Sequence, residues 1–162
     1  MKSIVVFLCL ALSLGFCFAQ EPDFSPPAGQ DGRPIIPPGR WEPLRSVLPR
    51  AFAALMPNEE ASGRKAMKSI RQNLAMSETA TETAAKQIDD ALKVTGPYAA
   101  YDLAGVQALP RGERLYRLAY LTYGAKAPAF WEATVYLSDT GWKVLDLSVA
   151  SDKIFEKAQG YR

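Results

Sequence analysis

The sequence predicts an α+β protein in which N-terminal helices pack on a four-stranded antiparallel curved sheet. Apolar residues recur at helical spacing in the first half of the chain, up to about residue 96. Aromatic and β-branched residues dominate from Tyr98 onward, in runs separated by short turns. Because neighbouring strands joined by short turns must run antiparallel, the second half is expected to form hairpins.

Residues 1–19 are predicted to be a secretory signal peptide that is cleaved after Ala19. Lys2 gives a positive start, residues 4–16 are almost entirely apolar, and Cys17 and Ala19 occupy the small-residue positions of a cleavage site. The apolar run is shorter than the roughly 20 residues that a membrane-spanning helix needs. We therefore expect a periplasmic or secreted protein with no stable membrane anchor after cleavage.

Cleavage of the predicted leader would also leave the mature chain without cysteine. Both cysteines, Cys9 and Cys17, lie inside it, and the sequence contains no histidine. This excludes thiolate nucleophiles, disulfides, imidazole bases and zinc sites built on sulfur or imidazole. Asp89, Asp90 and Asp139 do not have the alternating spacing of a calcium loop. We therefore expect no metal, no other cofactor and no catalytic residues.

Residues 20–40 are predicted to be a disordered tether, because they hold half of the twelve prolines together with three glycines. The tether either holds the domain away from the membrane or serves as a proline-rich ligand for a partner with a groove. Residues 41–162 then form a single α+β domain. The formal net charge of the whole sequence is +2 and falls to +1 in the mature chain, because Lys2 leaves with the leader, and this near-neutral balance does not indicate a nucleic-acid partner.

The first two helices are expected between the tether and residue 76. Apolar residues at helical spacing predict the first over residues 44–56, which Pro49 should kink or divide and Pro57 should end. The second is predicted to begin at Asn58. It carries a group of basic residues, which is interpreted as a solvated helix face and comprises Arg64, Lys65, Lys68 and Arg71.

The third helix has the clearest signals. Ser77 or Thr79 can cap its start, and Gly96 followed by Pro97 should stop it. Its buried stripe is predicted to be Ala84, Ile88, Ala91 and Leu92.

Four strands are predicted at about residues 98–109, 113–123, 128–138 and 142–150. The turn residues between them lie at 110–112, 124–127 and 139–141. After the last strand, Asp152 is expected to cap a short helix in which Phe155 closes one end of the core.

The register of the last hairpin follows from its apolar pattern. Pairing Ser138 with Trp142 gives one apolar face suited to packing under helices, made of Trp131, Ala133, Val135, Leu137, Leu145, Leu147 and Val149. The opposite face then combines aromatic, acidic and small polar residues, namely Phe130, Glu132, Thr134, Tyr136, Trp142, Val144, Asp146 and Ser148. In the preceding hairpin, pairing Tyr123 with Pro128 would add Arg117 to this face, within diagonal reach of Glu132.

This mixed face is the predicted binding surface. Its aromatic side chains would supply rigid apolar area, and its charged side chains would set the polarity of the rim. The predicted binding residues are Arg117, Phe130, Glu132, Tyr136, Trp142 and Asp146. Three occupants remain open: an exported protein partner, a second copy of the chain, or a small apolar ligand. The same aromatics also fit simple core packing.

The order of three helices and four antiparallel strands, ending in the stretch FWEATVYLSDTGWKVLDLSV, resembles the cystatin-like α+β roll of the nuclear transport factor-like superfamily. The resemblance covers roughly residues 77–150 and rests on element order rather than a diagnostic motif. It implies a curved sheet that wraps a helix and leaves a cone-shaped cavity. The superfamily includes ketosteroid-isomerase-like and dehydratase-like enzymes, small-ligand binders, and assembly or inhibitor modules, so the fold does not choose the function.

A small lyase or isomerase is the alternative function. Glu132 or Asp146, desolvated against Trp142 and Phe130, would act as general base, while Tyr136 or Tyr120 would donate to a developing oxyanion. Enzymes of the superfamily commonly recruit a histidine, which this chain lacks. The sequence therefore favours an exported, non-catalytic binding module.

Overall fold

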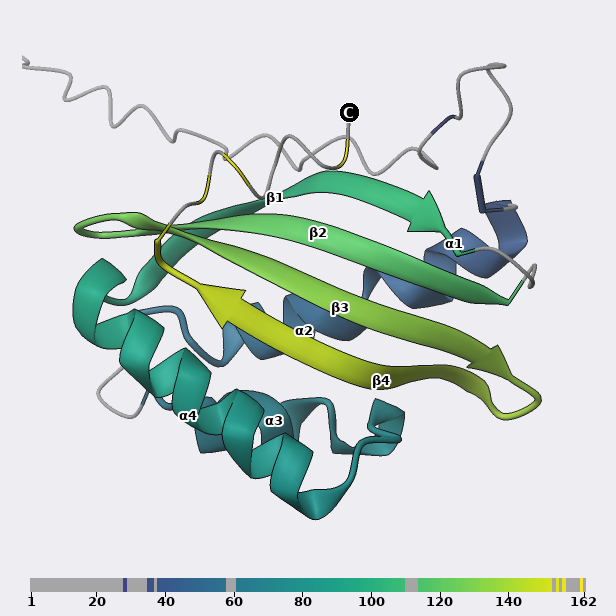
Figure 1. Cartoon of the computed structure of the whole chain (residues 1–162), viewed down its shortest axis with the longest axis horizontal. Helices are drawn as coiled ribbons and strands as arrows, with labels where there is room; N and C mark the ends of the chain where they lie inside the picture. The colour runs from purple at the N-terminus through teal and green to yellow at the C-terminus, as the bar shows by residue number, and fades with distance from the viewer. Residues whose placement is uncertain are drawn as a thin grey trace, which may run out of the picture.

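The computed structural model describes residues 28, 35–36, 38–57, 61–109, 114–152, 154, 156 and 161. In this part of the chain, the helices come first: α1 (Pro38–Arg45), α2 (Val47–Ala53), α3 (Gly63–Ser69), the short 3₁₀ helix η1 (Arg71–Asn73) and α4 (Glu78–Thr95). The strands follow as β1 (Tyr98–Ala108), β2 (Leu115–Gly124), β3 (Pro128–Ser138) and β4 (Gly141–Ala150). They form one antiparallel sheet in the order β1-β2-β3-β4 (Figure 1). The predicted fold class is therefore confirmed.

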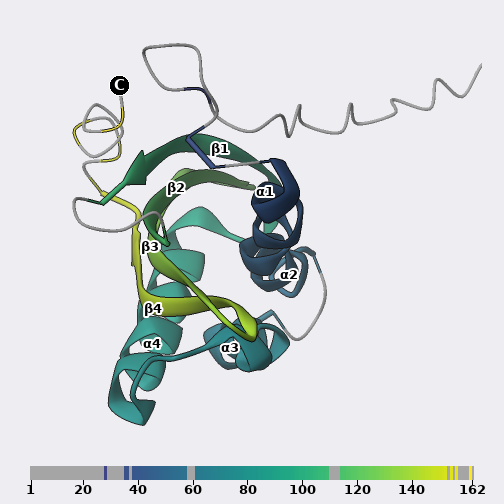
Figure 2. The same cartoon turned by 90° about the vertical axis from the view of Figure 1, so that its right-hand side faces the viewer.

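The sheet is curved, and Figure 2 shows α1, α2 and α3 on its concave side. The core lies between them and is rich in aromatic side chains. Phe52 of α2 sits at its centre, with ring centroids 5.0 Å from Tyr101, 5.3 Å from Tyr120 and 4.9 Å from Trp131. We call the sheet surface under the helices the core face and the convex surface the outer face.

The first predicted helix is divided, but the break falls at Ser46 and not at Pro49. Pro49 is the third residue of α2, where a backbone N–H would have no partner within the helix, so the ring is tolerated. Pro38 begins α1 for the same reason. The prediction of a tether up to residue 40 is therefore wrong at its C-terminal end, and Ile36 is fully buried in the core.

The second predicted helix begins later than expected. Ser62 is extended and caps α3, its Oγ accepting a hydrogen bond from the Lys65 N–H at 3.3 Å. Gly63, the first residue of α3, also donates its N–H to Asp89 Oδ1 of α4 at 2.7 Å. This short helix is therefore fixed at its N-terminus by two oxygen acceptors, and the predicted start at Asn58 lies among residues that the structure does not describe.

The predicted ends of α4 are confirmed. Ser77 caps it, with its Oγ accepting the Ala80 N–H at 3.2 Å, and Gly96 terminates it at φ +72°. Glycine adopts a positive φ without a steric penalty, which explains why the helix stops at this position. Ala84, Ile88 and Ala91 of the predicted stripe are buried.

The hairpin of β2 and β3 has the predicted register, with Tyr123 opposite Pro128. The hairpin of β3 and β4 agrees with the prediction only away from its turn, where Thr134 pairs with Asp146. A bulge then shifts the pairing by one residue, so that Leu137 faces Trp142.

The bulge places Trp142 and Val144 on the core face, and the prediction that both lie on the outer face is wrong. Trp142 is only 3% exposed, packs on Tyr116 and donates its indole N–H to the Arg40 carbonyl oxygen at 2.8 Å. Leu145, predicted to be in the core, is 40% exposed instead. Burying Trp142 and Val144 removes more apolar surface from water than Leu145 returns to it, so the shifted register wins.

Some predictions fall on residues that the structure does not describe. They are the signal peptide at 1–19, most of the tether, the turn at 110–112 and Phe155. Within the described residues, no helix combines the length and apolar character needed to span a membrane.

Candidate functional site

The structure brings most of the predicted binding residues to the outer face. Phe130, Glu132 and Tyr136 alternate along β3, and Arg117 lies on the neighbouring strand β2. Trp142 is the exception, because the bulge turns it to the core face. The surface considered below is therefore the outer face without Trp142.

Two small residues lie at the centre of this face, and we call the position above them the trough. Gly105 of β1 pairs with Ala119 of β2, and Ala119 pairs with Glu132 of β3, so the three form one row across the sheet. Ala119 is fully buried although it points away from the core. On the convex surface, such burial requires cover from neighbouring side chains or from another segment of the chain.

Tyr161, from the C-terminal end of the chain, lies on this trough. Its phenol oxygen donates a hydrogen bond to Glu132 Oε2 at 2.6 Å, and its ring lies 6.0 Å from the ring of Phe130. Phe130 is only 1% exposed beneath it. On the β1 side of the ring, a Cβ built on Gly105 would lie 2.7 Å from Tyr161 Cβ, and this distance is shorter than carbon atoms of real side chains approach one another. Glycine at this position is therefore required for the tyrosine to fit.

We call the site formed by Gly105, Phe130 and Glu132 around Tyr161 the tyrosine seat. Its polar end carries one anion and one cation. Arg117 Nε lies 3.6 Å from Glu132 Oε1, diagonally across the two strands as predicted. Glu132 thus faces a cation with one oxygen and accepts the tyrosine O–H with the other. Burial and the bond to Glu132 both raise the pKa of Tyr161, and the nearby guanidinium opposes them. The phenol is therefore neutral at ordinary pH and serves as a donor.

The remaining predicted residues lie away from the seat. Tyr136 is four residues beyond Glu132 along β3, which corresponds to about 13 Å of strand. Asp146 of β4 pairs with Thr134 and is exposed, so it is not desolvated.

The geometry also separates the groups of the predicted enzyme. Tyr120 is buried on the core face, where burial raises its pKa, and the sheet lies between it and Glu132. Trp142 is on that same core face and therefore does not desolvate Asp146. The predicted combination of Asp146, Trp142 and Tyr120 is therefore not assembled, whereas Glu132, Phe130 and Tyr136 share the outer face.

Sequence reasoning missed two members of the seat, Tyr161 and Gly105. Tyr161 stands in a polar C-terminal stretch with no pattern to mark it. Gly105 does carry a signal, since an isolated glycine inside a strand often marks a close approach of another chain segment.

Among the described residues, no group of three or more acidic, cysteine or histidine side chains is arranged to hold a metal ion. Comparison with protein-family models, with curated proteins and with solved structures found no significant match. The resemblance to the nuclear transport factor-like superfamily therefore stays a prediction.

Proposed function

We propose that this protein is an exported, non-catalytic binding module that recognises a protein segment carrying a tyrosine side chain on the outer face of its sheet. The chain's own Tyr161 occupies that seat in the free protein and is exchanged for the partner's tyrosine. The leader-like residues 1–19 support the exported location.

The observation that carries the proposal is the fit of Tyr161 into the trough. The seat supplies a floor without side chains at Gly105, an aromatic wall at Phe130 and a charged acceptor at Glu132. The seat thus packs an aromatic ring and also accepts a hydrogen bond from its hydroxyl group. This favours tyrosine over phenylalanine, which would leave the partly buried Glu132 carboxylate without this charge-assisted hydrogen bond.

The nature of the occupant favours a protein partner over a small apolar ligand. The seat is filled by a protein side chain, and it lies between strands on the face of a sheet. Tyr161 is held there by a hydrogen bond to Glu132 and a ring contact with Phe130, so an incoming tyrosine of similar chemistry can compete with it. A second copy of the chain is one such partner.

The proposal is tested by emptying the seat and offering the side chain back. In the mature Tyr161→Ala variant, a synthetic peptide of sequence AQGYR should perturb the backbone amide resonances of Phe130 and Glu132. The wild-type protein should respond less, because its own tyrosine competes at an effective concentration on the order of millimolar. A peptide of sequence AQGAR should have no effect.

Two second-site variants control the experiment. Adding Glu132→Ala to Tyr161→Ala should abolish the response, because the charged acceptor is lost. Adding Asp146→Ala should leave the response unchanged, because this carboxylate lies on the same face but away from the seat. If AQGYR and AQGAR act alike, or if Glu132→Ala has no effect, the outer face is not a tyrosine-binding site.

A further inference from the structure

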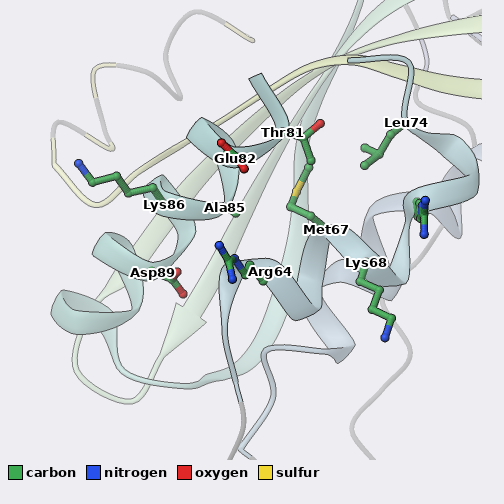
Figure 3. Close-up of a pocket in the computed structure, with 10 residues that line it drawn as sticks. Arg64, Met67, Lys68, Leu74, Thr81, Glu82, Ala85, Lys86 and Asp89 are labelled. Carbon is green, nitrogen blue, oxygen red and sulfur yellow. The ribbon is translucent and has the colours of Figure 1, made fainter. Parts of the chain in front are cut away.

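A second concave surface lies on the helical side of the molecule, away from the tyrosine seat. It is a cleft of about 670 Å³ between α3 and α4, within the size range of small-molecule sites. Figure 3 shows Met67 extending from α3 toward Thr81 of α4, with Leu74 beside them. Met67 and Ala85 are buried, so the floor of the cleft is apolar.

The rim of this cleft is basic. Arg64 and Lys68 of α3, Arg71 of η1 and Lys86 of α4 line it. Among the described residues that line the cleft, two are acidic, Glu82 and Asp89, and the Asp89 carboxylate already accepts a backbone N–H.

The four cations are distinctive because their side chains make neither an ion pair nor a hydrogen bond with a described residue, although Lys86 interacts electrostatically with the exposed carboxylate of Asp90. Elsewhere in the described chain, all arginines and lysines except Lys126 make ion pairs or hydrogen bonds, as Arg45 does with Glu42 and Lys93 with Asp90. Among the described residues, five basic side chains have neither an ion pair nor a hydrogen bond, and four of the five line this cleft. The fifth is Lys126, in the turn between β2 and β3.

From this concentration of unpaired positive charge around an apolar floor, we infer that the cleft binds a small amphiphilic anion. The ligand has one carboxylate or phosphate group and a hydrocarbon body. The head group is held by Arg64, which lies between α3 and α4 in Figure 3, and the body lies on Met67 and Leu74. Lys68 and Lys86 extend outward from the rim and add to its positive potential. Three of the four basic residues that the sequence suggested as a solvated helix face, Arg64, Lys68 and Arg71, thus become one wall of a site, and α4 supplies the other.

The probe is decanoate, titrated into the mature protein by calorimetry at low ionic strength. We expect one molecule to bind per chain, and we expect binding to weaken strongly in 1 M salt because the rim charges are screened. Decyl maltoside has the same chain without the charge, and inorganic phosphate has charge without the chain. Neither should bind measurably.

The Arg64→Gln/Lys86→Gln double variant removes one cation from each wall and should bind decanoate about tenfold more weakly. All the substituted side chains are exposed, so the fold should be retained. Lys126→Gln is the matched control, since it removes an unpaired cation outside the cleft, and it should bind like wild type. Tyr161→Ala should also bind like wild type, which separates this site from the proposed tyrosine seat.

The inference is overturned if decanoate does not bind, if decyl maltoside binds equally well, or if Lys126→Gln weakens binding as much as the double variant does. Binding of vesicles of phosphatidylglycerol without binding of monomeric decanoate also overturns it. That result would mark the four cations as a membrane-facing surface and not as a ligand site.

Discussion

Replacing Gly105 by alanine should release Tyr161 from the outer face without harming the fold. Gly105 is not among the glycines with positive φ, so alanine is compatible with its backbone. Its new Cβ, however, would lie 2.7 Å from Tyr161 Cβ and 3.2 Å from Cδ1 of the ring. Because the closest atom is the Cβ, a rotation of the ring cannot relieve the contact, and the C-terminal backbone must move.

The size of the effect follows from the contact that is lost. The hydrogen bond between the phenol and Glu132 is 2.6 Å long, and a bond to a charged group contributes about 1.5–3 kcal/mol. The equilibrium constant for docking of Tyr161 should therefore fall by roughly 10- to 150-fold. The domain itself should keep or slightly raise its melting temperature, since replacing glycine by alanine stabilises a compatible position by about 0.4–1 kcal/mol.

Fluorine NMR of protein labelled with 3-fluorotyrosine measures this directly. The Tyr161 resonance, assigned with Tyr161→Phe, should move to the position of a solvent-exposed tyrosine in Gly105→Ala, while the buried tyrosines stay in place. Gly39→Ala is the control, because a Cβ at that glycine meets no atom within 4 Å. An unchanged Tyr161 resonance in Gly105→Ala would refute the steric argument for the seat.

Three further predictions concern the core, the helix pair and pH. Thr122→Val should lower the free energy of unfolding by about 1–3 kcal/mol in urea titrations, because it leaves the buried Trp131 indole N–H without its 3.1 Å acceptor; Thr122→Ser should lose less, and equal losses would contradict this reasoning. Gly63→Ala should cost about 2–3 kcal/mol in the same assay, since its Cβ would collide with the Ala85 carbonyl oxygen, and a neutral result would show that α3 and α4 can move apart. Burial and hydrogen bonding raise the pKa of Tyr161, so docking should be full below the ordinary tyrosine pKa of about 10 and should weaken as pH rises above it. Amide spectra of β3 recorded across that range should follow this release in wild type, and the Tyr161→Phe variant should lack it.

The local elements of the fold were predictable because their signals are local. The cap at Ser77, the stop at Gly96 and the four strands all appear where the sequence predicts them, since caps, turns and alternation depend on neighbouring residues. The register of β2 with β3, and with it the approach of Arg117 to Glu132, was also correct.

The errors arose where two arrangements differ only in distant contacts. The bulge in β4 turns Trp142 inward. The inward position is stabilised by a ring contact with Tyr116 and by a hydrogen bond to the carbonyl oxygen of Arg40, which is 102 positions away in the sequence. The first predicted helix breaks at Ser46 and not at Pro49, where local sequence signals placed the break. The cleft between α3 and α4 depends on how these two helices pack against each other. Hydrophobic periodicity carries no information about such pairings.

The sequence by itself determined the α+β class, the order of the elements, the lack of histidine and the placement of Phe130, Glu132 and Arg117 on one sheet face. These properties follow from composition and from the two-residue period of a strand. Only the tertiary structure decided that Tyr161 occupies that face, and that four unpaired cations surround one cleft. Both depend on which segments meet in space, and that is set by the packing of the whole chain and not by any local pattern.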